Sequence, residues 1–158
     1  MAETENSIRP ESILSPERIV FLNYSSKREA LLALAKNIST APQIENPEEL
    51  SSEILKREDL MSTSIGMGIA IPHIRLPSIT GLVVSVGICQ TEILDFQTTD
   101  EEPVKLLLMI AAAHNQHAYY LQTLSFFSTF FKDSRIRSAL MESKNPREAW
   151  EILVNPKL

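Results

Sequence analysis

The chain has 158 residues, of which 44% are hydrophobic and 22% are charged, so it is long enough for one domain with a sizeable core. Its formal net charge of −5 gives a nucleic-acid role no electrostatic support. The single cysteine, Cys89, excludes an intramolecular disulfide and is expected to be a buried structural thiol. No apolar run approaches the roughly 20 residues of a membrane span, and the opening MAETENSIRPES lacks the apolar region of a signal peptide. We therefore expect a cytoplasmic protein that is not membrane-embedded.

The first half of the chain carries clear helix-start signals. We expect a flexible tail over residues 1–11, a single domain over 12–158 and a first strand over 18–22. The capping box that begins at Ser26 predicts a helix. Its inward face is formed by Leu31, Leu34, Ala35 and Ile38. Asn46 and the proline after it predict a second helix that ends near residues 57–58. Its inward residues are Leu50, Ile54 and Leu55.

The second half alternates strand and helix patterns. Short strands are expected over 68–71, where Pro72 stops the run, and over 93–96. Longer apolar runs predict strands over 82–88 and 104–111, the latter covered on both faces. Helices are expected over 115–131, 134–142 and 146–154. The first of these is expected to turn Leu121, Leu124, Phe127, Ser128 and Phe131 to one side.

This alternation predicts an α/β fold, specifically a three-layer sandwich. We expect a mixed and mostly parallel sheet of about five strands, with helices on both faces. In such sheets, sites form where strands end and the backbone opens toward loops.

His73 is the main candidate for a reactive residue. It follows Pro72, which lacks an N–H and has a fixed φ, so we expect the strand to end there and to present the imidazole. Gly66 and Gly68 permit close backbone approach just before it, and we expect them to be phosphate-binding residues. A histidine after a proline has a structural role more often than a reactive one, so the flanking residues decide.

The flanks read LKREDLMSTSIGMGIAIPH over residues 55–73. This block resembles the fructose/mannitol type of enzyme IIA domain of the bacterial phosphoenolpyruvate-dependent phosphotransferase system. That family shows an Arg-Glu pair, Ser-Thr, Ile-Gly-x-Gly and Ala-Ile-Pro-His at these spacings. The resemblance covers residues 12–155, and the opening ILSPER at 13–18 looks most like the free-standing nitrogen-regulatory branch. Downstream matches are Phe96, Asp100, Pro103-Val104, Leu121 and Thr123-Leu124.

The resemblance implies that His73 accepts a phosphoryl group from the phosphocarrier protein HPr and relays it or signals with it. Attack through Nε2 is implied, with Nδ1 held by a backbone carbonyl. A neutral imidazole is a suitable nucleophile near pH 7. Phosphoryl transfer requires mainly positioning and donors to the equatorial oxygens, so no cofactor or metal is expected.

The resemblance implies that residues flanking His73 bind the phosphoryl group, and for each of them a simpler structural role is the alternative. Arg57 matches the arginine near the family's active histidine and suits a phosphate; the alternative is an ion pair with its neighbour Glu58. Ser62 and Thr63 either donate hydroxyls to the phosphate or cap the turn before Gly66 and Gly68. Asp100 is expected to form a loop turn or to face a partner.

Two residues depart from the family pattern. Ile74 stands where the family prefers a small residue, and it is expected to crowd or re-aim the site. The family's second histidine aligns with Tyr120, whose hydroxyl donates but carries no positive charge near pH 7. His117, three residues earlier on a helix, is a second candidate replacement; otherwise it belongs to a solvated helix start.

Three functions are therefore weighed. The first is a phosphocarrier or regulatory protein, with HPr as donor and a IIB component or a regulated transporter or kinase downstream. The second is an enzyme IIA-like binding module that has lost phosphotransfer and regulates a partner by docking. The third is a metal site formed by His73, His114 and His117, for which the ligand spacing is poor.

Overall fold

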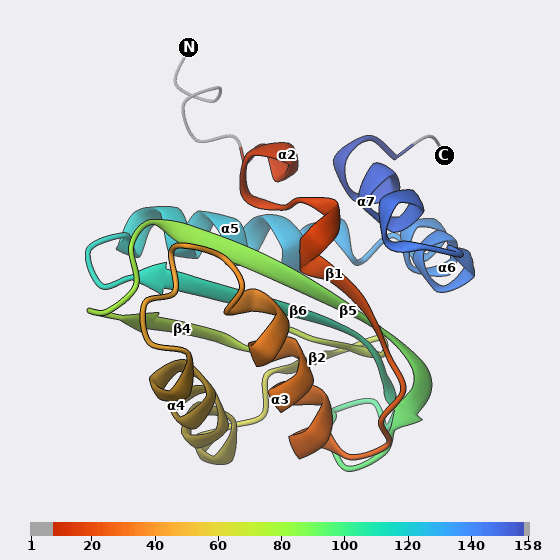
Figure 1. The fold of residues 1–158 in the computed structure, drawn as a ribbon. Helices are drawn as coiled ribbons and strands as arrows, with labels where there is room; N and C mark the ends of the chain where they lie inside the picture. The colour runs from red at the N-terminus through yellow and green to blue at the C-terminus, as the bar shows by residue number, and fades with distance from the viewer. Residues whose placement is uncertain (1–7, 157–158) are drawn as a thin grey trace.

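A mixed β-sheet divides the protein into layers, with helices on both of its faces (Figure 1). The structure is a computed structural model, and it describes residues 8–156. Within this range the sheet has six strands, in the order β1-β5-β6-β3-β2, with β4 also paired to β6. The strands are β1 (Ile19–Leu22), β2 (Ser64–Gly66), β3 (Ile69–Ala70), β4 (His73–Leu76), β5 (Leu82–Ile93) and β6 (Val104–Ala113). The expected three-layer α/β sandwich is confirmed, with one strand more than expected.

The two longest strands, β5 and β6, pair antiparallel at the centre of the sheet. The other pairings of these two strands are parallel: β1 with β5, and both β3 and β4 with β6. The hairpin of β2 and β3 is antiparallel. Both central strands are buried almost throughout, as their continuous apolar runs predict. Cys89 is buried in β5, and burial raises the pKa of its thiol to about 12, so the residue is structural.

Pro72 interrupts a strand rather than ending it, which corrects the sequence prediction. Ala70 pairs with Leu107 and His73 pairs with Ile110, three residues further along both strands, so the register is unchanged across the break. The proline lacks an N–H, but its carbonyl accepts a hydrogen bond of 2.9 Å from the Ile110 N–H. His73 therefore begins a second stretch of the same edge strand.

One face of the sheet is covered by α3 (Lys27–Ile38) and α4 (Pro47–Leu60). The predicted caps are present: Ser26 accepts from the Glu29 N–H and Asn46 accepts from the Glu49 N–H, both at 3.1 Å. Helix α4 continues beyond the expected end at residues 57–58 and stops at Met61, whose backbone is extended. The buried apolar residues of both helices join one core cluster with the inward side chains of the sheet.

The opposite face is covered by α5 (His117–Phe130), α6 (Ser134–Glu142), α7 (Pro146–Val154) and the short α2 (Pro10–Ile13). The Trp150 indole N–H donates to the Leu14 carbonyl at 2.8 Å and so links the N-terminal segment to α7. This segment continues through the 3-10 turn η1 (Pro16–Arg18) into β1. Of the expected tail, residues 1–7 lie outside the described residues, whereas Pro10 is buried in α2. Among residues 8–156, no helix is long and apolar enough to cross a membrane.

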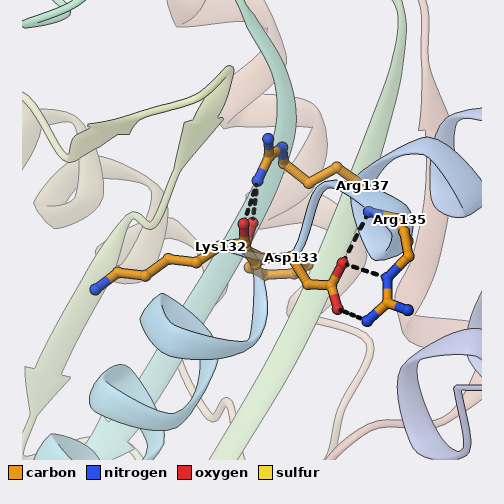
Figure 2. Close-up of polar contacts among 5 residues, drawn as sticks. Lys132, Asp133, Arg135 and Arg137 are labelled. Carbon is orange, nitrogen blue, oxygen red and sulfur yellow. Dashed lines mark hydrogen bonds and ion pairs between the residues drawn. The ribbon is translucent and has the colours of Figure 1, made fainter. Parts of the chain in front are cut away.

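The junction between α5 and α6 is fixed by two arginines (Figure 2). Arg137 donates to the last carbonyls of the preceding helix region, on Phe131 at 2.7 Å and Lys132 at 2.9 Å. Asp133 caps α6 by accepting from the Arg135 N–H, and its carboxylate also holds the Arg135 guanidinium at 2.8 Å. Cations at a helix C-terminus and a carboxylate at a helix N-terminus both complement the helix dipole.

Two further expectations were wrong in detail. Leu121 was expected on the same side of α5 as Phe127 and Phe131, but it is 47% exposed whereas both phenylalanines are buried. The buried residues of the helix are Tyr120, Thr123 and Phe127. Residues 93–96 do not form a separate strand, because β5 continues through an irregularity to Ile93 and then ends.

Replacing Gly87 by alanine tests the packing between β1 and β5. An added Cβ would lie 2.6 Å from Leu22 Cδ1, which is well inside van der Waals contact. We expect G87A to lower the free energy of unfolding by about 1–3 kcal/mol, measured by chemical denaturation. In a Leu22→Ala background the added methyl has room, so the double variant should lose less than the sum of the two single losses. Simple additivity would contradict the proposed clash.

Candidate functional site

His73 lies at the first position of β4 with its side chain partly buried. Its Nδ1 lies 2.6 Å from the Ile71 carbonyl oxygen. A carbonyl only accepts, so Nδ1 carries the hydrogen in this contact and Nε2 is left with its lone pair. The Ile71 carbonyl is available because the residue lies in the break between β3 and β4. The geometry thus prepares Nε2 as a nucleophile or base.

A buried carboxylate is linked to this histidine through the backbone. Glu58 is 4% exposed, and its carboxylate accepts from both the Thr63 hydroxyl, at 2.6 Å, and the Thr63 N–H, at 3.1 Å. The Thr63 carbonyl then accepts from the Ile71 N–H at 3.0 Å. The α4 terminus, the β2–β3 hairpin and the carbonyl that holds His73 are therefore joined in one hydrogen-bonded chain. Because the Thr63 hydroxyl already donates to Glu58, its role here is to position the chain.

The electrostatic surroundings lower the pKa of His73 below its ordinary value of about 6.5. Burial is the largest cause, because it disfavours the charged imidazolium, and the charge of Arg57 acts in the same direction. The contact with Ile71 and the charge of Glu58 oppose this shift. The net effect keeps the ring neutral, and so nucleophilic, near pH 7.

An open cleft of about 640 Å³ lies beside His73 at the edge of the sheet. Helix α4 contributes Arg57 and Lys56 to its walls, and α5 contributes His117 and Tyr120. Lys56 is paired with Glu53 at 3.2 Å, whereas Arg57 donates to the Met61 carbonyl at 2.9 Å. Arg57 therefore contacts the Met61 carbonyl, whereas Glu58 accepts hydrogen bonds from Thr63, so each residue of the Arg-Glu pair is bonded to a different group. The cleft, which Glu53 also lines, therefore combines an imidazole with one wall on α4 where Arg57 leaves an excess of positive charge, and this suits an anionic ligand.

Tyr120 contacts the imidazole directly. The centroids of the two rings are 5.7 Å apart, and Tyr120 is only 8% exposed. Burial raises the pKa of its hydroxyl to about 12, so it remains a neutral donor. His117 is exposed at the start of α5 and lines the same cleft. Both candidate replacements for a second histidine are thus at the site, and Tyr120 is the one that touches His73.

Arg75 is a cleft residue that sequence reasoning missed. Its guanidinium carbon lies 5.4 Å from the centroid of the Tyr120 ring, and it donates to the His114 carbonyl at 3.2 Å. The signal that identifies it is the two-residue period of a strand, which places His73 and Arg75 on the same face. That period was not applied because the strand was expected to end at Pro72.

The predicted residues around the glycine pair lie outside this cleft. Ser62 donates to the Gln97 carbonyl at 2.7 Å. Gly66 and Gly68 have φ values of 83° and 78°, and the hairpin they form directs the Met67 N–H to the Asp100 carboxylate at 2.7 Å. Gly68 and Asp100 line a different hollow, beside α6. The glycines therefore shape a hairpin, and Asp100 holds its loop.

Ile74 does not lie over the imidazole. Alternation along β4 turns it to the other face, where it packs against the core cluster beneath α3 and α4 while lining the cleft from that side. His114 also lies apart, in an exposed turn that borders another hollow. Among residues 8–156, no three His, Cys, Asp or Glu side chains are grouped to hold a metal ion.

Comparisons with known proteins agree on one family. The family model described as phosphoenolpyruvate-dependent sugar phosphotransferase system, EIIA 2, matches residues 12–155. A nitrogen regulatory protein from Bradyrhizobium diazoefficiens is 28% identical over 145 residues, which is 91% of this chain and 94% of that protein.

Two solved structures are similar in fold. The nitrogen regulatory protein IIA-Ntr of Neisseria meningitidis has a TM-score of 0.82 at 24% identity, covering 90% of this chain and 97% of that one. The mannitol enzyme IIA of Escherichia coli, solved with phosphorylated enzyme IIB, has a TM-score of 0.74 at 22% identity, covering 89% and 96%. The chain therefore belongs to the EIIA 2 family of the phosphoenolpyruvate-dependent sugar phosphotransferase system, and its similarities support the nitrogen-regulatory branch.

Proposed function

We propose that this protein is a phosphocarrier and regulatory component of the phosphotransferase system that accepts a phosphoryl group from HPr on Nε2 of His73. The observation that carries the proposal is the contact between Nδ1 and the Ile71 carbonyl, which leaves Nε2 as the nucleophilic nitrogen. The cleft beside it is open, and Arg57 gives its α4 wall an excess of positive charge. Membership of the family supplies the reaction class.

The transfer needs no added proton carrier. The Nε2 lone pair forms the new bond to phosphorus as the bond from phosphorus to the donor's histidine nitrogen breaks, and that electron pair stays on the donor ring. His73 keeps its hydrogen on Nδ1, so its ring gains a positive charge. The Ile71 carbonyl and the buried Glu58 carboxylate are placed to stabilise that charge.

Three residues of the cleft walls have distinct roles in this proposal. Arg57 donates hydrogen bonds to the phosphoryl oxygens, and its charge contributes to the positive potential of the site. Tyr120 donates its hydroxyl, since its high pKa keeps the proton in place. His117 is exposed and gives only a solvated wall of the cleft.

Downstream, we propose a partner that distinguishes the two states of His73. Phosphorylation adds about −1.5 to −2 charges at one open spot, which is enough to switch a docking surface. Such a partner is a IIB component, as in the mannitol complex, or a transporter or kinase regulated in the cytoplasm. The similarity to nitrogen regulatory proteins over most of both chains favours the regulatory use.

A second candidate is an enzyme IIA-like module that only docks. Tyr120 motivates it, because a neutral hydroxyl replaces a chargeable imidazole beside His73. The turned-away Ile74 argues against it, because the imidazole face toward α5 is not crowded. Phosphorylation of the wild-type protein distinguishes the phosphocarrier from the docking module.

The first test is the intact mass after incubation with enzyme I, HPr and phosphoenolpyruvate. We expect the wild-type protein to gain one phosphoryl group and His73→Ala to gain none. His114→Ala is the matched control, because it removes an exposed histidine outside the cleft and should phosphorylate normally. An unphosphorylated wild type would contradict the proposal and favour the docking module; uptake by His73→Ala at the normal rate would contradict the choice of residue.

Tyr120→Phe and His117→Ala compare the two candidate helper residues. We expect Tyr120→Phe to slow phosphorylation by about tenfold, the equivalent of one lost hydrogen bond, because the ring stays and only the donor is removed. His117→Ala should change the rate little. A slow His117→Ala with a normal Tyr120→Phe would reverse the assignment.

The pH dependence follows from the lowered pKa of His73. A base with a lowered pKa stays neutral to lower pH, so phosphorylation should remain fast through pH 6.5 and fall only below it. NMR titration of the ring should show a midpoint below about 6.5. In Glu58→Gln the midpoint should fall further, because the carboxylate raises the pKa and glutamine retains partners for Thr63. An unchanged midpoint would show that Glu58 does not act on the ring, and a higher midpoint would contradict the sign of its effect.

A further inference from the structure

We propose that Arg75 is a second phosphoryl-binding residue, which supplies the positive charge that Tyr120 cannot carry. The inference rests on the proposed function of His73 and adds one residue, Arg75, that binds the phosphoryl group. It starts from three residues that meet in one place: His73 and Arg75 from β4, and Tyr120 from α5.

Strand geometry places the two β4 side chains together. Residues two apart on a strand project from the same face, so Arg75 projects beside His73 rather than behind it. Both reach the Tyr120 ring, whose centroid lies 5.7 Å from the imidazole centroid and 5.4 Å from the Arg75 guanidinium carbon. All three line the same cleft.

The site needs a second cation because its tyrosine is neutral. The phosphoryl group spreads its negative charge over three oxygens, and cationic donors stabilise such charge more strongly than neutral ones. Burial holds the Tyr120 hydroxyl in its protonated form, with a pKa of about 12. Arg57 approaches from α4, whereas Arg75 approaches along the strand at the side of α5. Together they provide donors from two walls.

Arg75 is held loosely enough to respond to phosphorylation. Its guanidinium lies over the Tyr120 ring and donates to the neutral His114 carbonyl at 3.2 Å, which is the long end of the normal range. A dianionic phosphoryl group is a stronger acceptor than a neutral carbonyl. We infer that the guanidinium leaves His114 and binds the phosphoryl oxygens once Nε2 is phosphorylated, while Tyr120 keeps it near the site.

The test uses the full chain with Arg75→Gln and Arg75→Lys, and phosphorylated HPr as the donor. Arg147→Gln is the matched control, because Arg147 also lies over an aromatic ring, Trp150 at 5.7 Å, but outside the cleft. Circular dichroism and the denaturation midpoint confirm that each variant is folded. Two quantities are measured: the rate of phosphorylation and, by ³¹P NMR titration, the pKa of the phosphoryl group on His73.

We expect Arg75→Gln to slow phosphorylation by about 10- to 100-fold, the equivalent of one charge-assisted hydrogen bond. The pKa of the phosphoryl group should rise, because a cation that favoured its dianion is gone. Arg75→Lys should recover part of both effects, since it retains the charge without the planar fork. Arg147→Gln should match the wild type.

The outcomes separate this inference from the proposed function. If the wild type is phosphorylated and Arg75→Gln matches it in rate and in phosphoryl pKa, the role of Arg75 is excluded while that of His73 stands. If Arg75→Gln is slow but the phosphoryl pKa is unchanged, the residue acts only on the fold or on HPr docking, and the inference is again wrong. If the wild type takes up no phosphoryl group, both proposals fail together.

Discussion

The site depends on one hydrogen bond, between Nδ1 of His73 and the carbonyl of Ile71. It forms because Pro72 has no N–H and interrupts the strand, leaving a carbonyl outside the regular ladder and two residues before the imidazole. The bond fixes both the ring orientation and the position of its hydrogen. The other residues of the site therefore surround an imidazole ring whose orientation this bond has set. Glu58 and Thr63 hold the Ile71 segment, and burial keeps the ring neutral.

The cleft exists because the edge of the sheet lies between helices on opposite faces. Helix α4 brings a cationic wall from one layer, and α5 brings an aromatic wall from the other. The strand break lies between them, with an unchanged register on either side. Alternation therefore assigns His73 and Arg75 to one face and Ile74 to the other. Ile74, a departure from the family pattern, thus packs against the core cluster beneath α3 and α4 and borders the cleft from that side.

Much of the fold was predictable from local signals. The caps at Ser26 and Asn46 identified two helix starts, because a short polar side chain satisfies otherwise unpaired N–H groups. The apolar runs of β5 and β6 identified the buried centre of the sheet. The strand after Pro72 was missed, because a proline on an edge strand loses one ladder bond without changing the register. The inward face of α5 was misjudged at Leu121, because its aromatic residues allow more than one apolar stripe.

The sequence alone determined the family, and it singled out His73 and Arg57 as the candidate site residues, because these lie in one short block whose residue types and spacing are specific. It also determined where the chain departs from that family. Only the tertiary structure decided where the side chain of each departure lies. Tyr120 meets His73 although 47 positions separate them, and Arg75 reaches the same ring because β4 resumes its pairing with β6. Such contacts depend on how the layers pack, and packing between distant segments is not encoded in any one stretch of the chain.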